Sequence, residues 1–182
     1  ASDLKLMGLH NISNVMAALA LGHAAGLAME PMLQVAREFR GLPHRCEFIR
    51  QLGGVDYIND SKGTNVGATV AAIESLAPEQ GKVVLIAGGD GKGADFQPLA
   101  QPVAQHCRAV VLIGRDAPAI AAALPEDVVT VMASSFERAV SDAREIAHEG
   151  DRVLLSPACA SFDMFRDYND RGDQFRTLVE AL

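Results

Sequence analysis

Cysteine is scarce in this chain, and long apolar runs are absent from it. The three cysteines, Cys46, Cys107 and Cys159, are odd in number and far apart. This excludes a disulfide framework and a thiolate zinc site, and it fits a reducing compartment. No stretch approaches the roughly 20 consecutive apolar residues of a membrane-spanning helix, and the first residues show no basic-then-apolar export signal. We therefore expect a cytoplasmic protein that does not enter a membrane.

Positive charge is also in short supply. Sixteen Lys and Arg oppose 23 Asp and Glu, which gives a net charge of −7. Phosphate backbones are bound by basic surfaces, and the sequence has no run of Lys or Arg, so we expect no nucleic-acid partner. With 182 residues, 49% of them apolar and 21% charged, the composition is that of a globular protein and excludes a disordered chain. The length allows one full domain, or one domain plus a piece of another.

The hydrophobic pattern divides the chain into two parts. Two helical patterns open it, over residues 12–23 and 31–39, and Gly41-Leu42-Pro43 then interrupts the period. From Cys46 onward, short apolar runs alternate with helical stretches, which is typical of a sheet wound with crossover helices. We predict a boundary near Gly41, with residues 1–40 forming the helical end of one domain and residues 41–182 a complete second domain.

The second part is predicted to be a three-layer, Rossmann-like α/β domain. Its sheet is mostly parallel and has about six strands. Gly53-Gly54 between two short apolar runs indicates a hairpin, so the sheet starts with one antiparallel strand. The strands are predicted at residues 47–51, 55–58, 83–87, 109–113, 128–132 and 152–155. One intervening helix is predicted around Leu99, Val103 and Cys107, and the last helix contains Phe175 to Leu182.

Three loops that follow strands carry the polar residues of interest, because ligands of such sheets bind at the carboxyl ends of the strands. In the loop of residues 88–95, glycines, a helix start that Asp95 can cap, and Lys92 together favour an anion. This loop matches neither the Walker A pattern nor the dinucleotide fingerprint. A tight turn with a solvated lysine is an equal alternative.

The loop of residues 59–65 crowds polar groups at a strand end. Asp60 can accept hydrogen bonds from two ribose hydroxyls, and Lys62 and Thr64 can hold anionic oxygens. The alternative is that Asp60 or Thr64 only caps the following helix. Two neighbouring β-to-α loops, each with a lysine, favour an anionic ligand.

Two further segments offer groups to a ligand. In the loop of residues 156–162, the Ser161 hydroxyl and the Phe162 backbone N–H are possible donors. Cys159 has no sign of a nearby base and is predicted to be a small buried residue. Arg45, beside the predicted domain joint, is either a phosphate-binding guanidinium or a solvated surface residue.

Taken together, these motifs resemble the Mur ligases, the ATP-dependent amide-bond-forming enzymes of bacterial peptidoglycan precursor synthesis. The resemblance covers nearly the whole chain but only the C-terminal part of a family member. Within the family it points to the members that add D-glutamate. Five segments carry it, in order: GLHNISN at 8–14, GLPHR at 41–45, NDSK at 59–62, GGDGK at 88–92 and SPACAS at 156–161.

The resemblance implies ATP and Mg²⁺ as cofactors and a set of ligand contacts. The ATP contacts would be Asn14 at the adenine, Asp60 at the ribose, Lys62 at the nucleotide and Arg45 at the γ-phosphate. The D-glutamate contacts would be Thr64, Lys92, Ser161, the Phe162 N–H and Tyr168, which stands where the family often has phenylalanine. The Mg²⁺ ligands would lie mainly in a central domain outside this sequence, so we expect no metal ligand, nucleophile or base here.

The resemblance also implies a reaction. ATP phosphorylates the carboxylate of UDP-N-acetylmuramoyl-L-alanine, and the amine of D-glutamate attacks the acyl phosphate. Because the sequence lacks a Walker A loop, we expect this chain to be a monomeric part of a longer bacterial enzyme, without ligase activity alone. Two alternatives stay open: another Mur or folylpolyglutamate-type ligase, and a non-catalytic module that binds a small anion or nucleotide.

Overall fold

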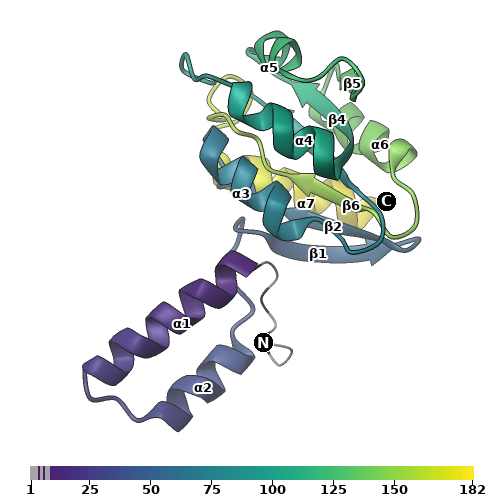
Figure 1. Cartoon of the computed structure of the whole chain (residues 1–182). Helices are drawn as coiled ribbons and strands as arrows, with labels where there is room; N and C mark the ends of the chain where they lie inside the picture. The colour runs from purple at the N-terminus through teal and green to yellow at the C-terminus, as the bar shows by residue number, and fades with distance from the viewer. Residues whose placement is uncertain (1–3, 5, 7–8) are drawn as a thin grey trace.

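The computed structural model describes residues 4, 6 and 9–182, which form a helical hairpin followed by an α/β unit (Figure 1). In the hairpin, α1 (Leu9–Ala24) and α2 (Met29–Glu38) run antiparallel and touch where Gly22 meets the sulfur of Met32. No residue of α2 is buried, so the described residues leave the hairpin largely exposed. The division of the chain near Gly41 stays a prediction. Within the described ranges, no helix combines the length and apolar character needed to cross a bilayer.

The α/β unit is built on one six-stranded sheet with the order β1-β2-β6-β3-β4-β5. Only β1 is antiparallel to its neighbour, and the Gly53-Gly54 turn that joins it to β2 has positive φ at both glycines, as a tight hairpin requires. The mostly parallel sheet with an antiparallel start confirms the predicted fold class. The strands are β1 (Glu47–Leu52), β2 (Val55–Asn59), β3 (Val83–Gly88), β4 (Cys107–Ile113), β5 (Val129–Met132) and β6 (Arg152–Leu155).

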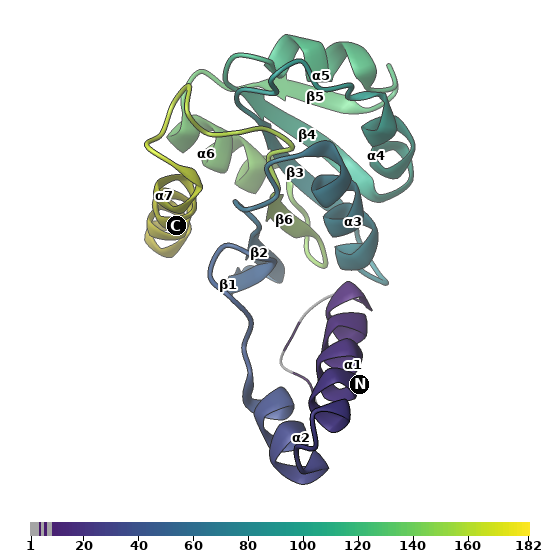
Figure 2. The same ribbon diagram turned by 90° about the vertical axis from the view of Figure 1, so that its left-hand side faces the viewer.

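Helices cover both faces of this sheet, which makes the three layers (Figure 2). Alternate residues of the buried strands point to opposite faces: Leu85 and Leu112 join one core cluster, and Ile86 and Val111 join the other. The first cluster is covered by α3 (Val66–Leu76), α4 (Ala100–His106) and α5 (Ala117–Ala123). The second is covered by α6 (Phe136–Ile146) and α7 (Tyr168–Ala181). A short 3₁₀ turn, η1 (Gln97–Leu99), precedes α4.

Two predicted element boundaries are wrong. Cys107 does not belong to a helix: its backbone is extended, and it opens β4 in register with Val83 of β3. The last helix begins at Tyr168, well before Phe175, because the Asp167 carboxylate caps it by accepting the Asp170 N–H at 2.9 Å. Its first turn is polar, so the apolar period from Phe175 onward could not reveal it.

Two expectations about the loops also fail. The cap of α3 is neither Asp60 nor Thr64 but Asn65, whose side-chain oxygen accepts the Ala68 N–H at 2.9 Å. Asp95 does receive the Gln97 N–H at the start of η1, as expected. The loops after β2 and β3 are not neighbours, because β6 returns to the sheet between these two strands.

Candidate functional site

The loop after β6 joins the other two polar loops into one surface at the carboxyl ends of the strands. The Ala158 N–H donates to the Gly63 carbonyl at 2.9 Å, which connects it to the loop after β2. Asp90 and Ala160 exchange two backbone hydrogen bonds, at 3.0 and 2.9 Å, which connect it to the loop after β3. The loop after β6 therefore connects the two lysine-bearing loops, although β6 lies between the strands that these loops follow.

Asp60 is buried, with 7% of its area exposed, and its carboxylate connects two segments of this surface. One carboxylate oxygen accepts the Cys46 N–H at 3.2 Å, and the other accepts the Ser156 hydroxyl at 2.8 Å. Burial raises the pKa of Asp60 to about 6, although the hydrogen bonds from Ser156 and Cys46 oppose the shift. Asp60 therefore fixes the segment around Cys46 to the carboxyl end of β2.

Arg45 stands between two residues with unusual backbone angles. His44 has φ 61° and Cys46 has φ 48°, a left-handed conformation that side chains other than glycine adopt at a cost. Hydrogen bonds hold both: the His44 N–H donates to Glu47 at 3.1 Å, and the Cys46 N–H donates to Asp60. The backbone is thus fixed on both sides of Arg45, whose side chain is exposed.

A cavity of about 220 Å³ brings together the four residues predicted to contact the nucleotide, namely Asn14, Arg45, Asp60 and Lys62. Two of them are cations that reach the same space from different segments, and that charge suits a phosphate chain. The residues present therefore fit the anionic part of ATP. The individual contacts of these residues stay predictions.

Both candidate lysines lie over aromatic rings. The Lys62 ammonium is 3.8 Å from the centroid of the Tyr168 ring, and the Lys92 ammonium is 5.5 Å from that of Phe162. Lys92 sits at φ 53° in a turn where its N–H donates to Asp90 at 3.0 Å. A cation within about 6 Å of a ring face is attracted by the π electrons.

The residues predicted to contact D-glutamate fall into two groups. Thr64, Lys92, Ser161 and Phe162 lie on the three joined loops, where Ser161 is buried and Phe162 is 66% exposed. Tyr168 opens α7, where its ring lies against the Lys62 ammonium and edge-on to the ring of His44. Its contact with D-glutamate stays a prediction.

Arg171 is a residue of this region that the sequence reasoning missed. Only 2% of it is exposed, and its guanidinium donates to the Ser61 hydroxyl and carbonyl and to the Cys159 carbonyl. Burial lowers the pKa of Arg171 to about 10. The signal was available: Arg171, Phe175 and Val179 share one face of a helix, and an arginine on an apolar face indicates a buried polar contact.

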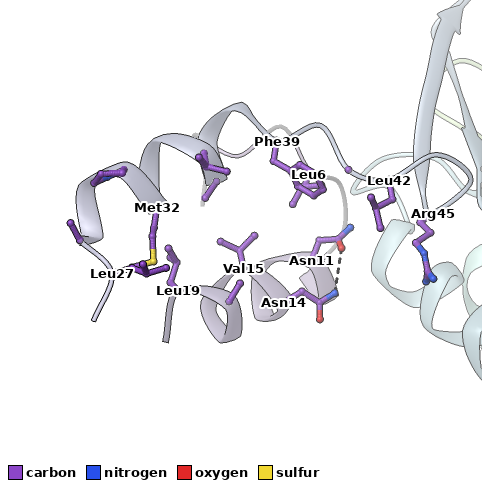
Figure 3. A pocket seen from close by; sticks show the side chains of 16 residues that line it. Leu6, Asn11, Asn14, Val15, Leu19, Leu27, Met32, Phe39, Leu42 and Arg45 are labelled. Carbon is purple, nitrogen blue, oxygen red and sulfur yellow. Dashed lines mark hydrogen bonds between the residues drawn. The ribbon is translucent and has the colours of Figure 1, made fainter. Parts of the chain in front are cut away.

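A larger cavity, of about 820 Å³, lies between α1 and α2 (Figure 3). Val15 and Leu19 from α1, Met32 from α2, and Phe39, directly after α2, point into it, so its lining is mainly apolar. Its polar end is formed by Asn11, Asn14 and Arg45, which also line the smaller cavity. The sequence predicted both helices but not this hollow between them.

The described residues do not form a metal site: no three His, Cys, Asp or Glu among them gather as ligands. We therefore assign no Mg²⁺ ligand among these residues and derive no step through the ion. Cys159 is buried, and burial raises the pKa of its thiol to about 12, as expected for a small packed residue.

The wound sheet and its strand-end loops define a Rossmann-like α/β unit, and comparisons with known proteins identify its family. The family described as "Mur ligase, glutamate ligase domain" matches residues 44–159. The chain is 78% identical over all of its 182 residues to the UDP-N-acetylmuramoylalanine--D-glutamate ligase of Marinobacter nauticus, and 56% identical over 181 residues to that of Pseudomonas aeruginosa. It spans 41% and 40% of the lengths of these two relatives.

Solved structures show the same fold. Thermotoga maritima UDP-N-acetylmuramate-alanine ligase matches 98% of this chain with a TM-score of 0.70 at 19% identity, and 39% of that protein is covered. MurF ligase from the same organism, in complex with ADP, matches 96% of this chain with a TM-score of 0.69 at 17% identity, and again 39% of that protein is covered. The chain belongs to the Mur ligase family and corresponds to the C-terminal part of its D-glutamate-adding relatives.

Proposed function

We propose that this chain is the amino-acid-binding part of an ATP-dependent, ADP-forming ligase that joins D-glutamate to UDP-N-acetylmuramoyl-L-alanine. The observation that carries the proposal is the 78% identity, over the whole chain, to a relative with that name. Under this proposal residues 1–40 end the central ATP-binding domain, and residues 41–182 form the C-terminal domain. The enzyme acts as a monomer in the bacterial cytoplasm, and Mg²⁺ is held mainly by residues outside this chain.

The role of this chain in the reaction is to position reactants and stabilise charge. D-Glutamate carries two carboxylates, and the joined loops carry Lys92, Ser161 and Phe162, whose ammonium, hydroxyl and backbone N–H are the donors proposed to bind them. Holding the amine beside an acyl phosphate converts a bimolecular attack into an effectively unimolecular one. The chain supplies no nucleophile; the attacking group is the substrate's amine.

In the cavity of about 220 Å³, the proposed contribution to the reaction is positive charge. Arg45 and Lys62 line one cavity and are expected to contact the phosphates of ATP, while Asn14 lies where that cavity meets the larger one. Cations at this position stabilise the negative charge that develops on the transferring phosphoryl group. Asp60 lines the same cavity, and its buried ties keep Cys46, next to Arg45, in place.

The test is a chimeric enzyme in which this chain replaces the corresponding part of the Marinobacter nauticus relative. We expect ADP formation that depends on D-glutamate and on UDP-N-acetylmuramoyl-L-alanine, and not on L-glutamate. Lys92→Ala should raise the KM for D-glutamate by roughly 10- to 100-fold, the worth of a hydrogen bond to a charged group. Lys82→Ala is the matched control, because Lys82 precedes the same strand that Lys92 follows.

Two results would contradict the proposal. One is a folded chimera that forms no ADP with D-glutamate, while the intact relative does so under the same conditions. The other is an equal loss in the Lys92 and Lys82 variants, which would show a general effect of lost charge instead of a site. Size-exclusion chromatography of the chimera checks the monomer.

A further inference from the structure

We propose that Tyr168 is a positioning residue that acts through Lys62, because its ring holds the Lys62 ammonium at the cavity of about 220 Å³. The inference rests on the proposed function, which assigns this cavity to the nucleotide. It changes the role implied by the resemblance, in which Tyr168 contacts D-glutamate. Tyr168 would instead control how well the nucleotide's phosphates are bound.

The Lys62 ammonium lies close to the Tyr168 ring. The Lys62 nitrogen lies 3.8 Å from the ring centroid, and both side chains are half-buried. The comparable pair of Lys92 and Phe162 is longer, at 5.5 Å, and Phe162 is mostly exposed. Attraction between a cation and a ring strengthens as water is excluded, so the Lys62 pair is the stronger one.

The Tyr168 ring is itself held in place by its neighbours. The Ser61 hydroxyl donates to the Tyr168 carbonyl at 2.7 Å, which ties the start of α7 to the loop after β2. The ring of His44 meets that of Tyr168 edge-on, with centroids 6.2 Å apart and planes at 79°. His44 is itself buried and within 3.1 Å of the Asn59 side chain. The aromatic face is therefore a fixed surface.

Lys62 is held both at its backbone and at its ammonium. Its backbone N–H donates to the His44 carbonyl at 3.0 Å, and its ammonium lies on the Tyr168 ring. A free lysine loses considerable rotamer entropy when it binds a phosphate, and prior ordering reduces that loss.

The contact is tested by proton NMR on the 182-residue chain. In the wild type, ring current should shift the ε-methylene protons of Lys62 upfield. We expect Tyr168→Phe to keep this shift and Tyr168→Leu to abolish it. Phe48→Leu, at an exposed aromatic on β1, is the control and should leave it unchanged. An unchanged Lys62 shift in Tyr168→Leu would overturn the proposal.

The functional consequence is tested by a double-mutant cycle in the chimeric enzyme, with ATP as the probe; the chimera without these substitutions is the wild type. Tyr168→Leu should weaken ATP binding by roughly three- to tenfold, and should have no further effect in a Lys62→Met background. The affinity for D-glutamate should be the same in the wild type and in Tyr168→Leu. If Tyr168→Leu weakens D-glutamate binding in both backgrounds, Tyr168 contacts the amino acid and the proposal is wrong. If the wild type binds neither ligand, the proposed function fails, while the Lys62 proton shift still decides the contact.

Discussion

The guanidinium of Arg171 in α7 donates to the backbone carbonyl of Ser61 at 2.9 Å, 110 residues away along the chain. The same group also donates to the Ser61 hydroxyl at 3.0 Å and to the Cys159 carbonyl at 3.3 Å. A single buried side chain therefore ties together the loops after β2 and β6. These two loops carry Lys62 and Ser161.

Replacing Arg171 should destabilise the protein and disorder this part of the site. In Arg171→Met, two buried carbonyls lose their donors, and we expect a loss of about 2–4 kcal/mol in the free energy of unfolding. Urea denaturation measures it. Arg166→Met, an exposed arginine in the loop just before α7, is the control and should leave the midpoint nearly unchanged. Equal effects of the two variants would show that the buried contacts of Arg171 do not stabilise the protein more than an exposed arginine does.

Asp60 should make the protein less stable as the pH rises. Its pKa is raised from 3.8 to about 6, so the folded state binds more protons than the unfolded state between these values. Stability from this group is present at low pH and decreases by at most about 3 kcal/mol as the pH passes through 6. Urea denaturation from pH 4 to 7 measures the slope.

Asp60→Asn provides the matched variant. The asparagine oxygen can still accept the Cys46 N–H, and its amide can donate to Ser156, whose hydroxyl also reaches Thr69 at 3.1 Å. We therefore expect the variant to fold and to lose the decrease in stability between pH 4 and 6. An unchanged slope would mean that another group causes it.

Asp151, in contrast to Asp60, should make the protein less stable as the pH falls. Burial alone would raise its pKa, but hydrogen bonds from the Arg108 guanidinium and from the His148 and Lys82 N–H groups outweigh this and lower it. A lowered pKa stabilises the folded state above the unfolded value, and this contribution is lost as the pH falls through the folded pKa. Asp151→Asn should cost about 1–3 kcal/mol at pH 7, because one amide oxygen replaces the two carboxylate oxygens that accept from Arg108, His148 and Lys82. The difference from wild type should shrink in acid; a constant difference would contradict the assignment.

Gly172 packs against the imidazole ring of His44 and leaves no space for a side chain. A Cβ at this position would collide with the imidazole of His44, which Asn59 holds in place. We expect Gly172→Ala to cost about 1–3 kcal/mol and to displace His44, which thermal unfolding and the His44 ring-proton shifts would show. Gly67→Ala in α3 is the matched control, because a Cβ there has space, and it should stabilise the protein by about 0.5–1 kcal/mol. The idea fails if both alanines stabilise.

The sequence by itself determined the local elements and the chemistry on offer. Periodicity predicted the strand of Arg152 to Leu155 and the helix of Ala117 to Ala123 at the bounds that the structure shows, because their apolar patterns are short-range. The Gly53-Gly54 turn likewise required only local backbone freedom. The three polar loops were also predicted at their places in the fold, since each follows a buried strand.

Only the tertiary structure decided which of these parts meet. The insertion of β6 between β2 and β3, the partnership of Lys62 with Tyr168 and the burial of Arg171 all depend on contacts more than 100 residues apart or on strand order. Local propensity carries no information on such contacts, because their free energy is gained only when distant segments are packed together. The same reason explains why the sequence did not reveal that Asp60 is buried and accepts hydrogen bonds from Cys46 and Ser156, whereas its contact with the nucleotide stays a prediction.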